Sequence, residues 1–361
     1  MKSLTDNKLN VLLAAAPLSW VLVATAPGSA WIFLTAAISL IPLAGLIGLG
    51  TEQLARRSGP ALGGFLNATF GNAAELIIAL VALLDGRVGL VKASITGSIV
   101  GNLLLVLGAS FFVGGLGRRS QKFDRTAATN TTSMLFLAVV ALVMPAVFDL
   151  ALYGNLAARP SAIERLSLLS AAVMIAAYAG SLVYAFTSQR DLFRSTHQGS
   201  HESPALPTMS AIGLLAIGTI LTTLQAEILV GEMQPALTRF GLSELFVGVI
   251  VVAIIGNAAE HYSALAAARR DEMTLAVEIA IGSSAQIALL VGPAVVLYSF
   301  MIGHPMTLLF NAFEIAAIAL SVIATALVVV DGESNWVEGM QLLAVYLILG
   351  IAMYFVPAAA G

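Results

Sequence analysis

The chain has no cysteine and few charged residues. The absence of cysteine among its 361 residues excludes disulfides and thiolate metal sites, but leaves the cellular compartment open. Charged residues make up 10% of the chain and hydrophobic residues 59%, against roughly 25% and 45–50% in ordinary soluble domains. A soluble core cannot absorb this excess, and no stretch remains for a large soluble domain. The basic residues are scattered, so the net charge of -3 gives no indication of nucleic-acid binding.

The apolar residues come in blocks of about 20, the length that a helix needs to cross a bilayer. We therefore expect an all-α polytopic membrane protein with eleven transmembrane helices. Breaks at charged residues, glycine and proline place the spans near 9–26, 30–54, 61–84, 88–116, 131–149, 165–187, 208–231, 243–268, 273–302, 306–330 and 338–358. We interpret the first block as a retained helix, because Ala24-Thr25-Ala26 is followed by Pro27 and makes a poor signal-peptide cleavage site.

The basic residues also predict an orientation. With the amino terminus in the cytoplasm, twelve of the 17 lysines and arginines fall in inside segments and five, Lys92 among them, in outside segments. The positive-inside rule then favours a cytoplasmic amino terminus and an external carboxyl terminus.

The sequence GNAAE occurs twice, at residues 71–75 and again at 256–260, where His261 follows it. The same offset of 185 residues carries Gly97-Ser98 onto Gly282-Ser283. Two motifs in register predict an internal repeat: a five-helix unit at 30–187, with its motif at 71–75, and a second at 208–361, with its motif at 256–261. Residues 1–29 form an added first helix, and the polar stretch 188–207 is a cytoplasmic linker between the units.

Five spans per unit make the second copy enter the membrane from the opposite side. The result is a ten-helix core of two inverted repeats, plus the extra amino-terminal helix. Inverted repeats are a transporter architecture, with the binding site near the middle of the membrane where the copies meet.

Polar side chains gather at these motifs. Residues three or four apart share a face of a helix, so Asn72 projects with Glu75, and Ser98 with Asn102. The second copy places Asn257 with Glu260 and His261, and Ser283 with Gln286. Apart from His261 these side chains carry oxygen, the ligand that hard divalent cations such as Ca²⁺ prefer. Neighbouring glycines allow close helix approach or local unwinding.

The two glutamates suggest a mechanism. A carboxylate in the middle of a bilayer costs at least roughly 2.5–3.5 kcal/mol, so two at repeat-related positions indicate a function. Glu75 and Glu260 sum to zero charge with one Ca²⁺ or with two protons, whereas the bare pair leaves two like charges in a poor dielectric. A protein that changes sides only when the pair is neutral is an antiporter, and the hypothesis requires at least two protons for each Ca²⁺. An ionisable His261 could add another.

Structural interpretations stay open beside this one. The Gly-Asn and Gly-Ser pairs can serve helix packing with an interhelical amide bond, and His261 can bond a neighbouring span. Glu314, with Asn311 three residues before it, is a secondary candidate for proton access.

GNAAELI with SITGSIVGN, and GNAAEH with IAIGSSAQIALLVGP, resemble the two signature repeats of the Ca²⁺/cation antiporter superfamily. The histidine after Glu260 and the later DGESNWVEGMQLL are similar to the H⁺/Ca²⁺ exchanger branch. The resemblance implies a ten-helix core with an extra first helix, and alternating Ca²⁺ and H⁺ binding by Glu75 and Glu260. It also implies that His261 takes part in proton coupling and that the site is lined by Asn72, Ser98, Asn257, Ser283 and Gln286. One departure is that Gln286 corresponds to Gly101, with Asn102 one residue on, so the ligands need not be symmetric.

We therefore expect an exporter of cytoplasmic Ca²⁺ driven by external H⁺, and not an enzyme. Ca²⁺ and H⁺ are its transported ions, the bilayer is its environment and no cofactor is implied. Exchange of Na⁺ for Ca²⁺, or transport of Mn²⁺, is the alternative; a cation channel and a membrane-embedded metalloenzyme are further ones, though no HExxH signature supports the last. Short loops favour a prokaryotic plasma membrane, and assembly with further copies of the chain is left open.

Overall fold

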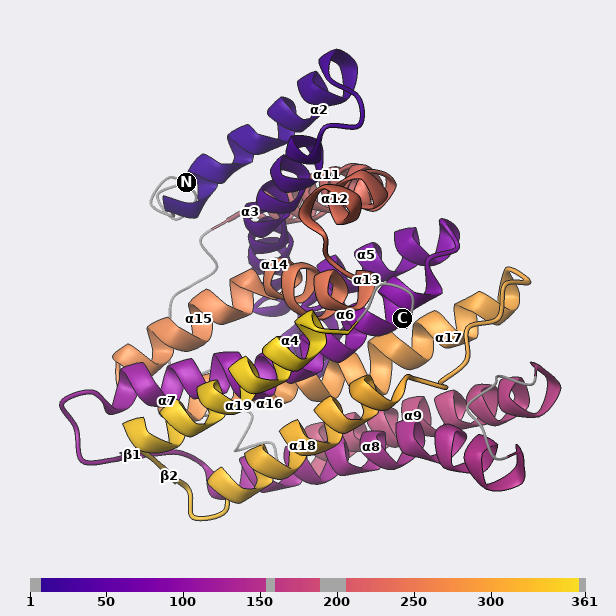
Figure 1. Cartoon of the computed structure of the whole chain (residues 1–361). Coiled ribbons are helices and arrows are strands. Elements are labelled where there is room, and N and C mark those ends of the chain that lie inside the picture. Colours follow the sequence, from indigo (N-terminus) through magenta and orange to yellow (C-terminus); the bar gives the residue numbers. More distant parts are fainter. Residues whose placement is uncertain (1–7, 154–159, 189–205, 357–361) are drawn as a thin grey trace. The chain divides into compact units, whose positions relative to one another are not determined.

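The structure, a computed structural model, describes residues 8–153, 160–188 and 206–356. Nearly all of the regular structure in these ranges is helical, and one short antiparallel pair of strands accompanies it (Figure 1). The predicted linker 188–207 lies outside the described residues except at its two ends.

The helices group into two compact units that interleave along the sequence. Unit 1 comprises residues 1–85, 179–242 and 255–259, and unit 2 comprises residues 86–178, 243–254 and 260–361. The two units are defined by contacts in space and not by the sequence repeat. The division of the chain into repeated units at 30–187 and 208–361 stays a prediction.

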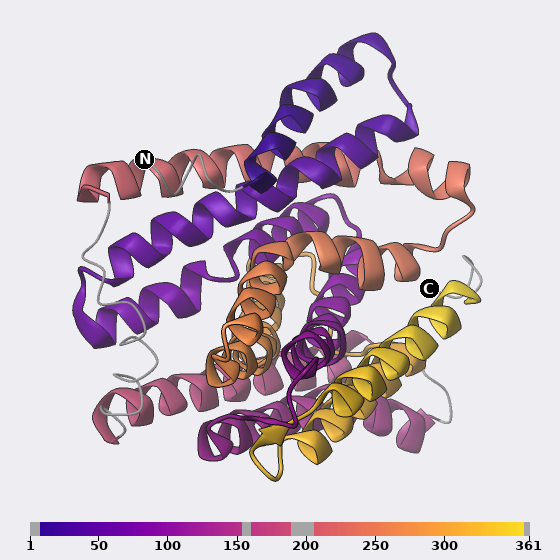
Figure 2. The ribbon, with the colours of Figure 1, turned by 90° about the vertical axis from the view of Figure 1, so that its left-hand side faces the viewer.

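Unit 1 contains the amino-terminal helices and the start of the second half of the chain. Its elements are η1 (Lys8–Ala14, a 3₁₀ helix), α2 (Ala15–Thr25), α3 (Ala30–Ala55), α4 (Gly59–Phe70), α5 (Ala73–Leu84), α11 (Thr208–Gly231) and α12 (Met233–Phe240), with the end of α9 (Pro160–Ser188) and the junction of α14 (Ala253–Gly256) with α15 (Ala258–Arg269). The long helices α3 and α11 lie side by side (Figure 2), and α2 packs on α3. Gly50 allows the close approach of α3 to α11, because a Cβ atom there would lie 3.0 Å from the backbone nitrogen of Leu215.

A buried polar contact joins α2 to α11 within unit 1. The hydroxyl of Ser19 donates to Gln225 Oε1 at 2.9 Å and to the carbonyl of Ala16 at 2.7 Å. Both Ser19 and Gln225 are fully buried. Helix α2 is therefore held by a hydrogen bond as well as by apolar packing.

We expect Gln225→Leu to lower the stability of the purified protein by about 1 kcal/mol, the usual net value of a buried hydrogen bond. In a chain of this length this loss lowers the thermal midpoint by roughly 2 °C. The matched control is Gln234→Leu on α12, where the side chain is exposed. Equal midpoints for the two variants, measured in detergent, would contradict a stabilising role for the contact.

Unit 2 contains the remaining helices. Its elements are α6 (Val88–Val100), η2 (Gly101–Val106), α7 (Leu107–Gly115), β1 (Gln121–Lys122), α8 (Arg125–Tyr153), most of α9, α13 (Glu244–Phe246), η3 (Val247–Val252), the rest of α15, α16 (Met273–Gln286), η4 (Ile287–Val291), α17 (Gly292–Met301), α18 (Ala312–Val328), β2 (Glu333–Ser334) and α19 (Trp336–Tyr354). Helix α19 packs along α7, and α8 packs against α16 and α18 (Figure 1). Strand β1 pairs with β2, so that Gln121 faces Ser334.

Three helical stretches in unit 2 are π-helical, namely η2, η3 and η4. Two of them begin within four residues of a Gly-Ser motif: η2 at Gly101, after Ser98, and η4 at Ile287, after Ser283. Such bulges carry one extra residue in a turn and occur often at functional sites. Both are continuous with their flanking α-helices, so that Val88–Gly115 and Met273–Met301 each form one long apolar helix.

Seven helices in the described ranges are long and apolar enough to cross a membrane. They are Ala30–Ala55, Val88–Gly115, Arg125–Leu152, Ala162–Tyr184, Thr208–Gly231, Met273–Met301 and Trp336–Tyr354. An eighth span results if Met233–Phe240 and Glu244–Gly256, which meet at a bend of 110°, count as one. These seven helices match seven of the predicted spans, and the full number of eleven stays a prediction.

The other four predicted spans fall on shorter or interrupted helices. The predicted span 61–84 is broken at Gly71 and Asn72, and 243–268 is broken at Asn257. The span predicted at 306–330 begins only at Ala312, because Asn311 caps the helix there. The first block, Leu9–Thr25, is a short apolar helix.

Candidate ion-binding site

Glu75 and Glu260 occupy the same position in two helices. Glu75 is the third residue of α5 and Glu260 the third residue of α15. The residue before each helix is the motif asparagine, Asn72 or Asn257, and each is 1% exposed. The first N–H groups of a helix lack intrahelical acceptors and carry partial positive charge. Each glutamate therefore lies where backbone dipoles favour a carboxylate.

Within unit 1 the first glutamate lies against the second motif. A Cβ atom placed on Gly256 would be 3.4 Å from Glu75 Cγ and 3.9 Å from Glu75 Oε1. The side chain of Glu75 thus lies within van der Waals range of position 256 in the second motif. Unit 1 contains Asn72, Glu75 and Asn257, although they are up to 185 residues apart in the chain.

Within unit 2 the two Gly-Ser segments meet. The side-chain amide of Asn102, at the start of η2, donates to Ser283 Oγ on α16 at 3.2 Å. One residue along, Ser284 Oγ donates to the carbonyl of Ile99 at 3.4 Å. Asn102, a secondary candidate from sequence, therefore contacts a residue predicted to line the site. Ser98 is buried, at 3% exposure, and Gln286 is half-buried at the end of α16.

Glu260 and His261 also belong to unit 2, on α15. Both side chains are half-buried, but the atoms Glu260 Oε2 and His261 Nε2 are inaccessible to solvent and have no hydrogen-bond partner in the described part of the chain. An unpartnered buried polar atom is costly. The carboxylate oxygen of Glu260 is therefore suited to face a cation or to take up a proton.

The turn after α15 leads directly into α16, which carries Ser283. Arg270 closes this turn through a hydrogen bond to Glu272 Oε2 at 2.8 Å, and this bond lowers the pKa of Glu272 from its ordinary value. The buried Gln121 also contacts this turn, since its Nε2 donates to the carbonyl of Ala268 at 3.2 Å and to Asp271 Oδ1 at 2.5 Å. These hydrogen bonds fix the turn that joins the end of α15 to the start of α16, and both helices carry candidate site residues.

Glu314 has a structural partner, Asn311, which the sequence indicated only by its spacing of three residues. Its carboxylate accepts from the backbone N–H of Asn311 at 2.9 Å, and its own N–H donates to Asn311 Oδ1 at 2.9 Å. This reciprocal pair is a capping box at the start of α18. Glu314 is 2% exposed. The capping box accounts for its burial, and its role in proton access stays a prediction.

Lys92 is a residue that the sequence interpretation missed. It was counted with the outside segments, but it lies in α6, six residues before Ser98. Its Nζ donates to the carbonyl of Leu309 at 2.7 Å and lies 5.8 Å from the centre of the Phe310 ring. A lysine inside a predicted span was the signal that could have identified this contact, because such a cation needs a buried acceptor.

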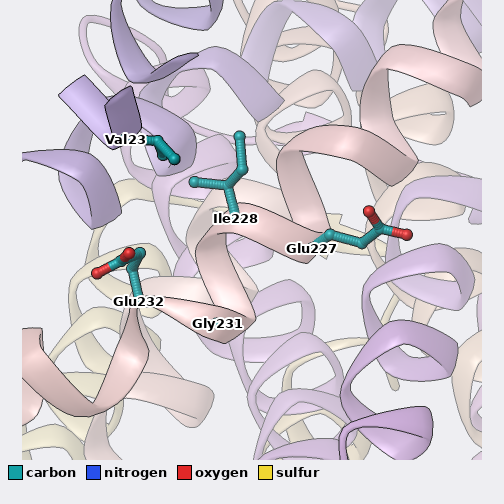
Figure 3. A pocket seen from close by; sticks show the side chains of 5 residues that line it. All are labelled: Val23, Glu227, Ile228, Gly231 and Glu232. Atoms are coloured by element: carbon teal, nitrogen blue, oxygen red, sulfur yellow. The ribbon is translucent and has the colours of Figure 1, made fainter. Parts of the chain in front are cut away.

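The distribution of possible metal-binding side chains and the position of a cavity are two further observations. In the described ranges no group of three or more histidine, aspartate or glutamate side chains could hold a metal ion. A cavity of about 300 Å³ in unit 1 is lined by Val23, Glu227, Ile228, Gly231 and Glu232 (Figure 3). None of the residues predicted to bind or line the cation site lies in this cavity.

The apolar helices and the buried polar residues on broken or bulged helices define an integral membrane transporter. A family model described as sodium/calcium exchanger protein matches residues 28–187 and 210–355. The chain therefore belongs to the sodium/calcium exchanger protein family.

Individual relatives agree with this assignment. The chain is 39% identical to the "Ca(2+)/H(+) antiporter" of Synechocystis, covering 96% of this chain and 97% of the relative. It is 41% identical to the "Ca(2+)/H(+) antiporter ChaA" of Bacillus subtilis, covering 90% and 92%. Among solved structures, that of native YfkE matches with a TM-score of 0.83 and 38% identity over 96% of this chain and 99% of the other. The two named relatives are transporters and not enzymes.

Proposed function

We propose that this protein exchanges cytoplasmic Ca²⁺ for external H⁺ by alternating access, and that Glu75 and Glu260 bind Ca²⁺ or protons in turn. The observation that carries the proposal is the placement of both glutamates in the first turn of helices that begin at the repeated motif. Two relatives that cover at least 90% of the chain are named Ca²⁺/H⁺ antiporters, which supports the same ions here.

The charge balance explains why the two fluxes are coupled. Two carboxylates and one Ca²⁺ are neutral together, and so are the same two carboxyls with two protons. The empty pair carries two negative charges, which a low-dielectric site disfavours strongly. A conformational change is therefore easy for the Ca²⁺-loaded and proton-loaded forms and difficult for the empty one.

The neighbouring polar residues complete the proposed site. Ca²⁺ takes six to eight oxygen ligands, more than two glutamates can supply. Asn72, Ser98, Asn257, Ser283 and Gln286 are assigned to the lining, with Asn102 and Glu314 as secondary candidates. Interrupted helices also leave backbone carbonyls without intrahelical partners, as in transporter sites of this architecture. His261 is assigned to proton coupling, since Nε2 has no partner among the described residues.

We infer that the fold is a ten-helix core of two inverted five-helix repeats preceded by an extra helix. The interruptions at Asn72 and Asn257 are related by the offset of 185 residues, and the π-helical stretches η2 and η4 follow related Gly-Ser motifs. An amino terminus in the cytoplasm and an external carboxyl terminus complete this topology. Bacterial relatives support a prokaryotic plasma membrane as its location.

Na⁺ in place of H⁺ is the second candidate, because the family model itself describes sodium/calcium exchangers. Mn²⁺ is an alternative cargo, since it also accepts oxygen ligands. His261 favours H⁺ over Na⁺ in this proposal, because an imidazole exchanges protons and supplies no oxygen ligand for a cation.

Everted membrane vesicles that contain the protein test the proposal. With an acid interior we expect uptake of radioactive Ca²⁺, and with an imposed Na⁺ gradient at equal pH we expect none. Collapse of the pH gradient by a protonophore is the control and should stop uptake. Uptake driven by Na⁺ alone would support the second candidate, and a conductance far above transporter rates would indicate a channel.

A further inference from the structure

Asp271 lies in the turn between α15 and α16, and its backbone has a conformation that side chains other than glycine rarely adopt. Its φ is 66°, the only positive value for a non-glycine residue in the described part of the chain. Just after the end of a helix, glycine is the usual residue for this conformation because it has no Cβ atom. A non-glycine residue held in this way persists where surrounding contacts fix the backbone. What Asp271 offers over glycine at this position is its side chain.

The carboxylate of Asp271 joins this turn to the loop that follows α7. Its Oδ1 accepts from Gln121 Nε2 at 2.5 Å and lies 4.0 Å from Arg118 Nε. The same Gln121 Nε2 donates to the carbonyl of Ala268 at 3.2 Å, near the end of α15. Arg118 Nη1 donates to the carbonyl of Gly114 at 2.7 Å, in the last turn of α7. Asp271 therefore links the end of α15 to the end of α7 within unit 2.

Further contacts reinforce this link. Gln121 is 2% exposed and is held in place by its pairing with Ser334 across β1 and β2. The backbone N–H of Asp124 donates to Thr274 Oγ1 at 3.1 Å, in the first turn of α16. We name this set of contacts the clasp. It consists of Asp271 and Thr274 on one side and Arg118, Gln121 and Asp124 on the other.

The clasp holds one end of α16, and a second contact holds the helix further along. Asn102 in η2 donates to Ser283 Oγ at 3.2 Å. Ser283 is ten residues after Met273, the first residue of α16, which is about 15 Å along the helix. Because η2 and α7 belong to one continuous helix, α16 is fixed to that helix at two separate points. Without the clasp, only the contact beside the candidate site would set the tilt of α16.

Helix α15 ends at the same turn. It has 12 residues, and Glu260 lies in its first turn. Hydrogen bonds along so short a helix make it move as one piece, so that a displacement of its last turn also displaces Glu260. The positions of Glu260 and Ser283 relative to each other therefore depend on how the turn between their helices is held.

We propose that Asp271 is a positioning residue for the cation site and that it acts through Gln121 and Arg118. It holds the turn between α15 and α16 against the loop after α7, and it thereby sets the relative positions of Glu260 and Ser283. This inference rests on the proposed function, because that function assigns Glu260 and Ser283 to one site.

The variants Asp271→Gly and Asp271→Asn separate the role of the side chain from that of the backbone. Glycine adopts a positive φ without strain, but it offers Gln121 Nε2 no acceptor. Asparagine tolerates the same φ, and its side-chain carbonyl can accept the bond from Gln121. If Asp271 serves only to form the turn, Asp271→Gly keeps wild-type transport. If Asp271 positions the site, Asp271→Gly impairs transport and Asp271→Asn does not.

Transport is measured in proteoliposomes with an imposed pH gradient. We expect Asp271→Gly to raise the Ca²⁺ concentration for half-maximal uptake by about tenfold, the lower end of the cost of losing a group that orients metal ligands. The maximal rate should stay near that of wild type, because both glutamates remain to balance the charge of the bound ions. The thermal midpoint should also stay near that of wild type, because relief of backbone strain offsets the lost hydrogen bond. Asp271→Asn should restore the wild-type half-maximal concentration.

The matched control is Glu272→Gln, in the same turn. Glu272 pairs with Arg270 at 2.8 Å, and the side chains of both residues are about half exposed, at 45% and 59%. This ion pair lies within the turn and does not join it to the loop after α7. Exposed ion pairs contribute little, so we expect the wild-type half-maximal concentration.

A distance measurement tests the clasp without reference to the transported ion. The chain contains no cysteine, so a pair of spin labels can be attached at Ser263→Cys on α15 and Leu116→Cys after α7, where both side chains are exposed. In the full-length chain in liposomes, we expect a narrow distribution of label distances with Asp271 or Asp271→Asn. Asp271→Gly should broaden it.

Three results would each overturn the proposal: an unchanged half-maximal concentration in Asp271→Gly, an unchanged distance distribution in that variant, or an equal transport defect in Glu272→Gln. Failure of the proposed function has a different signature, because wild type itself would then not exchange Ca²⁺ for H⁺. The label distances would still decide whether Asp271 holds the turn.

Discussion

Glu75→Gln and Glu260→Gln are each expected to abolish H⁺-driven Ca²⁺ uptake. Glutamine keeps the size of the side chain and one carbonyl oxygen, but it cannot take a negative charge or carry a transported proton. With one carboxylate left, the Ca²⁺-loaded site has a charge of +1, and the empty site can balance only one proton. We expect the initial rate in proteoliposomes to fall by more than about 100-fold, equivalent to roughly 2.7 kcal/mol.

The control for this pair is Glu333→Gln, the same chemical change on β2. The side chain of Glu333 is 46% exposed and its carboxylate lies 3.7 Å from Lys122 Nζ. A surface ion pair of this kind contributes little, so we expect uptake at the wild-type rate. Wild-type uptake in either Glu75→Gln or Glu260→Gln, with the protein folded, would remove that glutamate from the mechanism.

The sequence was sufficient to predict the helical membrane architecture, because hydropathy is a property of the residues themselves. The bilayer demands apolar blocks of a fixed length, and seven such blocks match long helices within a few residues. The interruptions were harder to predict. The apolar pattern continues through Gly71 and Asn72, and nothing in it reveals that helix α4 ends and α5 begins there. The glycines indicated local unwinding, but not where the backbone would break.

Contacts between helices were beyond the sequence argument. Helical periodicity places Asn72 beside Glu75, but it cannot show that Glu75 lies against Gly256, because that contact depends on tertiary packing. The same holds for the bond from Asn102 to Ser283. The sequence did place Glu314 and Asn311 three residues apart, and the capping box that this spacing favours was overlooked.

The two repeated Gly-Ser motifs differ in how tightly their glycines are packed, and this difference leads to a second large expected effect. Gly97 and Gly282 are equivalent in sequence, each preceding a motif serine. A Cβ atom on Gly97 would overlap the backbone of Val249 in η3, whereas a Cβ atom on Gly282 would meet no atom within 4 Å. Gly97 is therefore essential for the packing of α6 on η3, and Gly282 has no such role among the described residues.

We expect Gly97→Ala to destabilise the protein by about 1–3 kcal/mol or more, as overpacking usually does, and to impair transport because Ser98 is the next residue. Gly282→Ala is the matched control. Alanine is favoured over glycine inside a helix by about 1 kcal/mol, and this gain applies equally to both sites, so the difference between the two variants measures packing alone. The thermal midpoint in detergent should fall for Gly97→Ala and stay level or rise for Gly282→Ala. Equal midpoints would mean that α6 and η3 can separate without cost, and the close contact would then have no part in holding Ser98 in place.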